Sequence, residues 1–287
     1  FIFFIFETLI RIIFLLPWLI QNMELLKEDR YHIVKGMLSE VTFNNLFARA
    51  VVQHHVSGSV YVDDVENPST SYIIHPYGMS LLLGNPGNDN FNRQFRKYTL
   101  NEHKIRSKPE WLQAFPASWH QTLKSLFKNE LVQTEEHLPK KTNPVIEQHT
   151  RLNFRFNQGK FLRNKLKKTG NEASITPVDV EIFNNMTGTV VPKSFWDNAG
   201  AFLNRGAGFS IIYRSKLAST AYSAFVVDHY LELGIETLPE YQGRGFARAA
   251  CQALINYCLK NSFEPVWACR KGNIGSIYLA EKLGFEV

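Results

Sequence analysis

The sequence has 287 residues, of which 45% are hydrophobic and 20% are charged. This composition excludes a disordered protein, and the length is sufficient for two domains of ordinary size. The formal net charge is +6, from 32 Lys and Arg residues against 26 Asp and Glu residues. Such a charge favours polyanionic partners, but it does not distinguish a nucleic acid from a membrane surface or a phosphate-rich cofactor.

The segment from residue 1 to residue 20 is apolar apart from Glu7, Thr8, Arg11 and Pro17. Its length is close to the roughly 20 residues that a membrane-spanning helix needs. It has no basic start and no small-residue cleavage site, which argues against a signal peptide. An ordinary globular pattern begins at Met23. We therefore expect residues 1–22 to be untranslated upstream sequence or an artefact outside the folded protein, with a genuine membrane anchor as the alternative.

Residues 23–168 show the pattern of a smaller α/β domain. Hydrophobic periodicity predicts helices and then short strands, namely helices over 24–38 and 43–55 and strands at 60–62, 71–75 and 80–83. A further helix is predicted over 110–127, with a break or kink at Pro116. His54 and His55 are adjacent, so on a helix their side chains diverge by about 100°, which argues against a shared metal ion.

A basic segment closes this first domain. Residues 151–168 interleave seven Lys and Arg residues with apolar and aromatic ones. Such a mixture is typical of nucleic-acid-binding surfaces. We favour instead a strand followed by an amphipathic helix with a solvated basic face, so we expect no nucleic-acid partner and keep nucleic-acid binding as a less favoured alternative function. Gly170 and Asn171 mark a break, so the domain boundary is placed after Lys168.

Residues 169–287 carry the most informative patterns. Strands are predicted at 173–178, 208–214, 218–227 and 231–238, with a helix over 193–203 among them. A helix, a strand and another helix follow. The last residues, 284–287, begin a strand that we expect to be truncated.

The turn after the predicted strand 231–238 leads directly into a helix. Gly243 and Gly245 lack Cβ atoms, so their backbone amides can approach a ligand closely. Arg244 and Arg248 lie where the helix starts, a place unfavourable for cations unless an anion is bound. Such a turn is suited to a pyrophosphate. No Gly-Lys-Ser/Thr follows, which excludes a Walker loop, and a dinucleotide fingerprint needs Gly or Ala in place of Arg248.

The three cysteines give no sign of a metal site. They form no Cys-x-x-Cys pair and have no histidine at ligand spacing, so neither zinc nor a disulfide framework is predicted. Cysteines without a predicted disulfide are typical of a protein in the reducing cytoplasm, which is the location we expect. Cys251 and Cys258 lie seven residues apart on the predicted helix, and we expect them to be buried small hydrophobes.

The turn and the end of the chain together resemble the GNAT acyltransferase superfamily. Gln242, Gly245 and Ala247 match its Gln/Arg-x-x-Gly-x-Gly/Ala pattern, which also follows a strand. Asn273 starts a helix predicted to end at Gly284, and Ser276, Leu279, Lys282 and the Leu-Gly-Phe ending match the same superfamily. Asn273 is predicted as the N-cap, and Gly284 as the left-handed residue that ends the helix. More narrowly, residues 234–245, 256–258 and 265–267 resemble the bacterial two-domain GNAT family that includes zwittermicin-resistance proteins.

The resemblance implies an α/β fold in which a mixed, mostly antiparallel twisted sheet is flanked by helices and is preceded by the smaller α/β domain. It also implies an enzyme that transfers an acetyl group from acetyl-CoA directly to the amine of a small molecule. The backbone of one strand would pair with the pantetheine arm, and the turn would hold the pyrophosphate. The implied cofactor residues are Ile235, Glu236, Thr237, Gln242, Gly243, Arg244, Gly245, Phe246, Ala247 and Asn273.

Catalysis needs a base, because an amine is protonated at neutral pH. Glu232 and Glu236 are the nearest candidates, and strand alternation places them on one face, where solvent exposure would also account for them. A bulge in this strand, common in the superfamily, would change which side chains face the cleft.

The proton donor is unassigned. Many GNAT enzymes have a tyrosine directly after the leucine that corresponds to Leu279, but this sequence has Ala280 there. Tyr278 lies about 200° round the helix from Ala280, which argues against its taking that place. A non-catalytic sensor that binds the coenzyme is therefore an alternative function.

Overall fold

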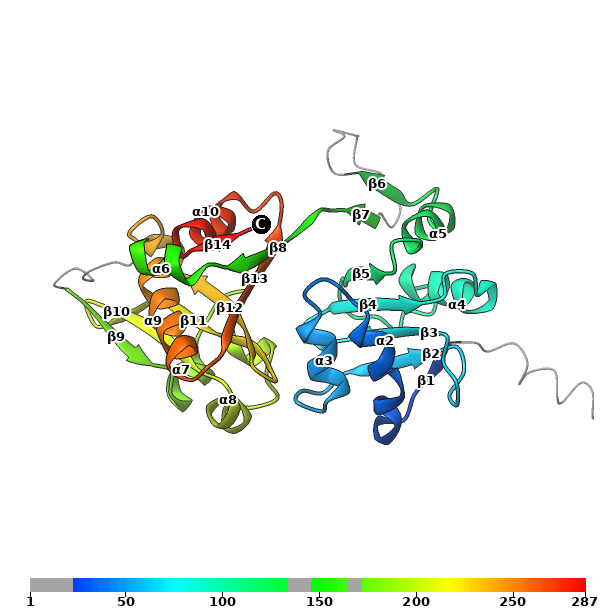
Figure 1. Cartoon of the computed structure of the whole chain (residues 1–287), viewed down its shortest axis with the longest axis horizontal. Helices are drawn as coiled ribbons and strands as arrows, with labels where there is room; N and C mark the ends of the chain where they lie inside the picture. Colours follow the sequence, from blue (N-terminus) through cyan, green and yellow to red (C-terminus); the bar gives the residue numbers. More distant parts are fainter. Residues whose placement is uncertain (1–22, 134–145, 165–171) are drawn as a thin grey trace, which may run out of the picture. The chain divides into compact units, whose positions relative to one another are not determined.

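The computed structural model describes residues 23–133, 146–164 and 172–287. It forms two compact units, and the chain passes between them more than once (Figure 1). The described part of the first unit comprises residues 23–41, 51–53, 58–133 and 146–148, and that of the second comprises 42–50, 54–57, 149–164 and 172–287.

The first unit is built on a five-stranded sheet in the order β1-β2-β3-β4-β5. Its strands are β1 Glu24–Leu25, β2 Ser59–Val62, β3 Thr70–Ile74, β4 Met79–Gly84 and β5 Trp111–Phe115. Neighbours are antiparallel except β4 and β5, which are parallel and are connected through the helix α4, Asp89–Thr99. Aromatic residues of α4 pack with Tyr72, Leu82 and Trp119 in one buried cluster.

Short elements complete the first unit. They are the 3-10 helix η2 Glu28–Val34, helices α2 Lys35–Ser39, α3 Leu46–Val52 and α5 Trp119–Leu126, and the parallel strands β6 Leu131–Gln133 and β7 Ile146–Gln148. Only part of α3 belongs to this unit, since residues 42–50 group with the second.

Two helices predicted for the first unit differ from the structure. The prediction of one helix over 110–127 is wrong in its first half, because residues 111–115 pair with β4 as strand β5. Pro116 separates that strand from α5, in keeping with a proline that cannot continue a helix. The predicted helix 24–38 is divided into β1, η2 and α2, because Glu24 and Leu25 pair with β2.

The second unit contains a seven-stranded sheet in the order β14-β8-β13-β12-β11-β10-β9. In chain order its strands are β8 Arg151–Phe156, β9 Ala173–Pro177, β10 Gly208–Tyr213, β11 Lys216–Val227, β12 Tyr230–Thr237, β13 Glu264–Arg270 and β14 Phe285–Glu286. Only β12 and β13 are parallel neighbours. The predicted strand at the end of the chain is thus present as β14.

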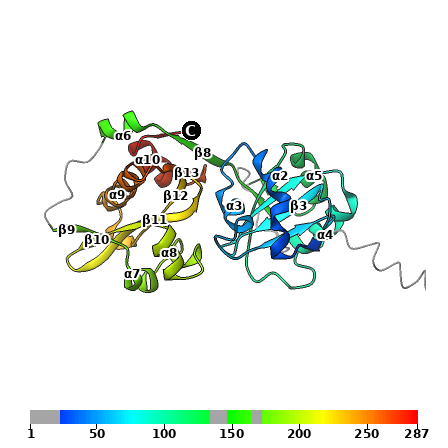
Figure 2. The ribbon, with the colours of Figure 1, turned by 60° about the horizontal axis from the view of Figure 1, so that its bottom comes forward.

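Helices cover both faces of this sheet. Figure 2 shows α9 (Phe246–Lys260) and α10 (Ile274–Lys282) on one face and α7 (Val180–Asn185) and α8 (Ala199–Arg205) on the other. Leu254 and Cys258 of α9 pack with Leu231 and Leu233 of β12 in the larger core. All three cysteines are free and buried, as expected for Cys251 and Cys258.

Two expectations for the second unit are corrected. The predicted helix 193–203 is instead the 3-10 helix η3, Pro192–Ser194, followed by α8, whose N-cap Asn198 accepts a hydrogen bond from the N–H of Ala201. The boundary expected after Lys168 also differs, because β8 and the helix α6, Gln158–Asn164, belong to the second unit. β8 lies between β13 and β14, so its residues complete the C-terminal sheet.

The two sheets share one topology. In each, four successive strands are antiparallel neighbours, and a helix then leads to a fifth strand that is parallel to the fourth. Thus β1 to β5 with α4 correspond to β9 to β13 with α9. Within the described residues, no helix is both long enough and apolar enough to cross a membrane. The apolar segment 1–22 lies outside the described residues.

Candidate functional site

The central feature of the second unit is a fork between its two parallel strands. β12 and β13 pair at three positions, of which the last joins Glu232 to Val266. Beyond that point β12 continues to Thr237 alongside β11, while β13 pairs on its other edge with β8. The β13-facing backbone edge of residues 233–237 is therefore available to an extended ligand that would pair like an added strand.

The turn from β12 to α9 has the conformation that its glycines suggest. Gly243 and Gly245 have φ angles of 75° and 80°, in the left-handed region, and Gly245 is the N-cap of α9. A Cβ atom built on either residue would meet no other atom within 4 Å. The turn is therefore open on its outer side. The first N–H groups of α9 have no acceptor within the helix, so they can bind an anion there.

Aromatic and cationic side chains surround the turn. The guanidinium of Arg244 lies 5.6 Å from the ring centre of Tyr213 and 5.9 Å from that of Tyr241. Phe246 packs on the Tyr213 ring at 5.2 Å between centroids. Arg248 instead donates to the backbone oxygen of Asn164, so of the two arginines it is Arg244 whose charge stays at the mouth of the turn.

The helix α10 has the ends predicted for it. The side chain of Asn273 accepts a hydrogen bond from the N–H of Ser276 at 3.1 Å, which confirms the N-cap. Gly284 has a φ of 89° and directly follows the C-cap residue Leu283, which confirms the left-handed ending. Ala280 is wholly buried in the core, whereas Tyr278 on the same helix is 61% exposed.

Glu232 lies at the apex of the fork and is almost fully buried. Its side chain is 7% exposed, and its Oε1 lies 3.4 Å from the guanidinium of Arg151 on β8. Burial raises the pKa of the Glu232 carboxyl, while the Arg151 charge and the Asn44 amide act in the opposite direction. Neither Oε2 of Glu232 nor Nδ2 of Asn44 has a hydrogen-bond partner with good geometry among the described residues. One carboxylate oxygen is therefore buried without a well-formed hydrogen bond, which leaves its lone pairs able to take up a proton.

Glu236 has a different environment on the same strand. Its Oε2 accepts hydrogen bonds from the backbone N–H groups of Thr189 and Val190, in the loop between α7 and η3. The predicted bulge lies in the neighbouring strand, where Ala224 is the extra residue in β11 opposite Glu232 and Leu233. Alternation along β12 is therefore continuous, and the two glutamates share the face opposite the core residues Leu231 and Leu233.

Sequence reasoning missed two members of this site. Arg151 belongs to the basic segment 151–168, and nothing in the charge pattern of that segment indicates that one of its cations pairs with a buried carboxylate. Asn44 lies 188 residues before Glu232 in the sequence, and no sequence signal joins them. Elsewhere in the segment, Phe154 and Phe161 are buried in the core, which agrees with the predicted strand and helix. Its last residues, 165–168, lie outside the described part.

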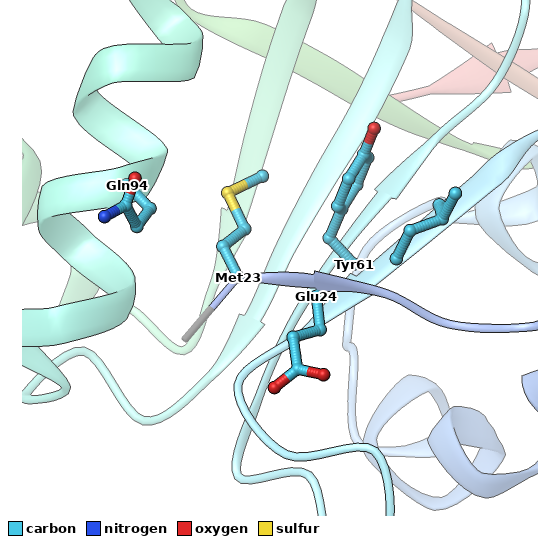
Figure 3. A pocket seen from close by; sticks show the side chains of 5 residues that line it. Met23, Glu24, Tyr61 and Gln94 are labelled. Atoms are coloured by element: carbon cyan, nitrogen blue, oxygen red, sulfur yellow. The ribbon is translucent and has the colours of Figure 1, made fainter. Parts of the chain in front are cut away.

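Two other features, a surface pocket and the pair His54 and His55, are less suited to binding a cofactor than this site. A surface pocket in the first unit is lined by Met23, Glu24, Leu25, Tyr61 and Gln94 (Figure 3). Its lining offers one carboxylate and no cation, so it is poorly suited to a phosphate. In the described ranges, which include His54 and His55, no three His, Cys, Asp or Glu side chains are grouped as metal ligands would be.

Comparisons with known proteins point to one family. A sequence model of the family described as GNAT acetyltransferase matches residues 37–287. The chain is 26% identical over 263 residues to the uncharacterized N-acetyltransferase YdfB of Bacillus subtilis. That alignment covers 91% of this chain and 94% of the relative.

Solved structures show the same fold. A GCN5-related N-acetyltransferase-like protein from Streptococcus suis aligns with a TM-score of 0.64 at 17% identity, covering 90% of this chain and 94% of that one. A tandem GNAT protein from the clavulanic acid biosynthesis pathway aligns with a TM-score of 0.57 at 10% identity, covering 92% and 95%. The expected fold class, a mixed and mostly antiparallel sheet flanked by helices, is confirmed.

Proposed function

This chain belongs to the GNAT acetyltransferase family, and we propose that it transfers an acetyl group from acetyl-CoA directly to the amine of a small molecule. The observation that carries the proposal is the fork between β12 and β13, which opens beside a glycine turn at the start of α9. The two features are adjacent along the chain. An extended thioester arm and a pyrophosphate would therefore be bound by one continuous stretch of backbone.

The coenzyme would be held mainly by backbone groups. Residues 235–237, which include Glu236, would pair with the pantetheine arm on the open edge of β12. The amides of the turn 242–247 would bind the pyrophosphate, with the charge of Arg244 beside them. Asn273, whose oxygen caps α10, would add a side-chain contact from the far side of the fork. When bound, acetyl-CoA supplies the activated acetyl group, and no metal is required.

Glu232 is the better candidate for the base. It lies at the last paired position of the fork, and its Oε2 has no hydrogen-bond partner of good geometry among the described residues. It would accept a proton from the ammonium form of the acceptor, directly or through water. The free amine would then attack the carbonyl carbon, the new C–N bond would form, and the C–S bond would break to release the thiolate, while the nitrogen would lose its second proton to solvent as the amide forms. A backbone amide of β12 would stabilise the oxyanion.

A coenzyme-binding sensor without activity is the second candidate. It is favoured by Ala280, which is buried in the core at the position where a proton donor was expected. Tyr278 lies on the exposed side of α10 and does not replace it. In a transferase of this kind the thiolate would take its proton from solvent.

Thiol release from acetyl-CoA distinguishes the two functions. The purified chain is incubated with acetyl-CoA and a panel of small amines, polyamines and amino sugars, and free thiol is measured with a chromogenic disulfide. We expect at least one amine to accelerate thiol release in proportion to enzyme, with the acetylated amine found by mass spectrometry. Saturable binding of acetyl-CoA with no release by any amine would favour the sensor.

A further inference from the structure

One carboxylate of β12 holds a loop that comes much earlier in the chain. Oε2 of Glu236 accepts a hydrogen bond from the N–H of Val190 at 2.8 Å and another from the N–H of Thr189 at 3.2 Å. The hydroxyl of Thr189 lies 3.5 Å from the same oxygen. Two successive backbone N–H groups directed at one anion form a concave anion-binding arrangement, here filled by a side chain of the protein itself.

The loop has few other attachments between its two ends. Met186 and Val191 are each 2% exposed and fix the loop where it leaves α7 and where it approaches η3. Between them, residues 187–189 are exposed and Val190 is half-buried. The amides of an exposed loop ordinarily bind water. At Thr189 and Val190 they bind Glu236 instead, which ties the middle of the loop to the sheet.

The glycine in the loop lies directly against the same side chain. Gly188 has a φ of 138°, a conformation that residues with a Cβ rarely adopt. A Cβ atom built on it would lie 2.7 Å from both Cγ and Cδ of Glu236. The loop therefore packs onto Glu236 as closely as a backbone without a side chain allows.

We propose that Glu236 is a positioning residue that fixes the loop 187–190 over the substrate face of β12 and so shapes the site for the acceptor amine. We assign its carboxylate to holding the loop and not to proton transfer, since Oε2 already accepts two backbone hydrogen bonds. Glu232, four residues earlier on the same face, is left as the base. This inference rests on the proposed function, which places the reaction at β12.

Hydrogen–deuterium exchange tests the anchor without coenzyme or acceptor. In Glu236→Ala, we expect the amides of Thr189 and Val190 to exchange about tenfold faster or more, as for loss of hydrogen bonds to a charged group. Glu236→Gln retains an oxygen that accepts from both N–H groups, so most of the protection should remain. Glu240→Ala removes an exposed carboxylate beyond the end of β12 and serves as the matched control. Equal exchange in the wild type and in Glu236→Ala would overturn the proposal.

Kinetics with the best amine from the thiol-release screen separate positioning from proton transfer. We expect Glu236→Ala to raise the KM for that amine by about tenfold, and Glu236→Gln to restore a value close to the wild type. Glutamine can accept the loop's hydrogen bonds but cannot take up a proton. If Glu236→Gln loses kcat as fully as Glu236→Ala, and the acidic limb of the pH profile disappears, Glu236 is the base and the proposal is wrong.

The two proposals can fail separately. If acetyl-CoA does not bind, the acetyltransferase proposal fails even when exchange shows that Glu236 holds the loop. If acetyl transfer is found but loop exchange does not respond to Glu236→Ala, only the positioning role is lost.

Discussion

Glu232 and Glu236 show how surroundings separate two identical side chains on one strand face. Glu232 is buried, and Arg151 near its Oε1 partly offsets the loss of hydration. Glu236 is half-buried, and its charge is used by the amides of Thr189 and Val190. A general base needs an available lone pair near the reacting amine. Among the described residues of this face, Oε2 of Glu232 meets that need at the apex of the fork.

Replacing Glu232 by Gln should abolish most of the activity while the coenzyme still binds. The variant keeps the shape of the side chain but cannot accept a proton, so we expect kcat to fall by at least about 100-fold. Glu264→Gln, which alters an exposed carboxylate at the start of β13, should have little effect. Steady-state kinetics of thiol release check both variants. Near-normal kcat in Glu232→Gln would remove it as the base.

Arg151 should set the pH at which activity is lost in acid. A base works only when ionised, so activity falls as the pH drops through its pKa. Burial raises the pKa of Glu232, and the Arg151 charge lowers it. In Arg151→Met the pKa should rise further, and the acidic limb of kcat/KM should move to higher pH. Arg155→Met, on the exposed side of the same strand, is the control. An unmoved limb in Arg151→Met would contradict the electrostatic role of Arg151.

At the scale of elements, the sequence correctly predicted the features that depend on short stretches of neighbouring residues. The turn 242–247, the cap at Asn273 and the left-handed Gly284 depend on a few neighbouring residues, and each was predicted from the sequence. The predicted helices over 110–127 and 193–203 were wrong because strand pairing and the cap at Asn198 override periodicity. A contact between distant segments does not alter the hydrophobic periodicity of either segment, so it cannot be predicted from that periodicity.

The end of α10 should be sensitive to a single methyl group. A Cβ atom on Gly284 would lie 2.6 Å from the backbone N of Phe161 and 2.9 Å from the backbone O of Asn157. Gly284→Ala therefore combines a left-handed strain of about 1–2 kcal/mol with a backbone clash. Gly272→Ala, where a Cβ meets nothing within 4 Å, is the matched control. Thermal unfolding should show a marked loss of stability for Gly284→Ala alone. Equal melting temperatures would show that α6 does not pack against this turn.

At the scale of the whole molecule, the chain repeats one topology, but the corresponding sites differ. β4 and β5 pair at all five positions from Met79 to Leu83, so these two strands form no fork like that between β12 and β13. Asn88 caps α4 by accepting from the N–H of Phe91, and Asp89 adds a negative charge to its first turn. Both features oppose an anion at the start of α4. The sequence predicted two domains, but it could not show this repeat, which appears only in the strand order.

Calorimetric titration with acetyl-CoA tests the central claim most directly. The account predicts saturable binding of about one coenzyme per chain, at the start of α9. Gly245→Ala strains a φ of 80° at that site, so the free turn should relax to another conformation that binding must reverse, which should weaken binding by about tenfold for a cost of about 1–2 kcal/mol. Gly87→Ala, in the corresponding turn of the first unit, should leave binding unchanged. Two coenzymes per chain, no binding at millimolar concentration, or equal affinity in Gly245→Ala and the wild type would contradict the account.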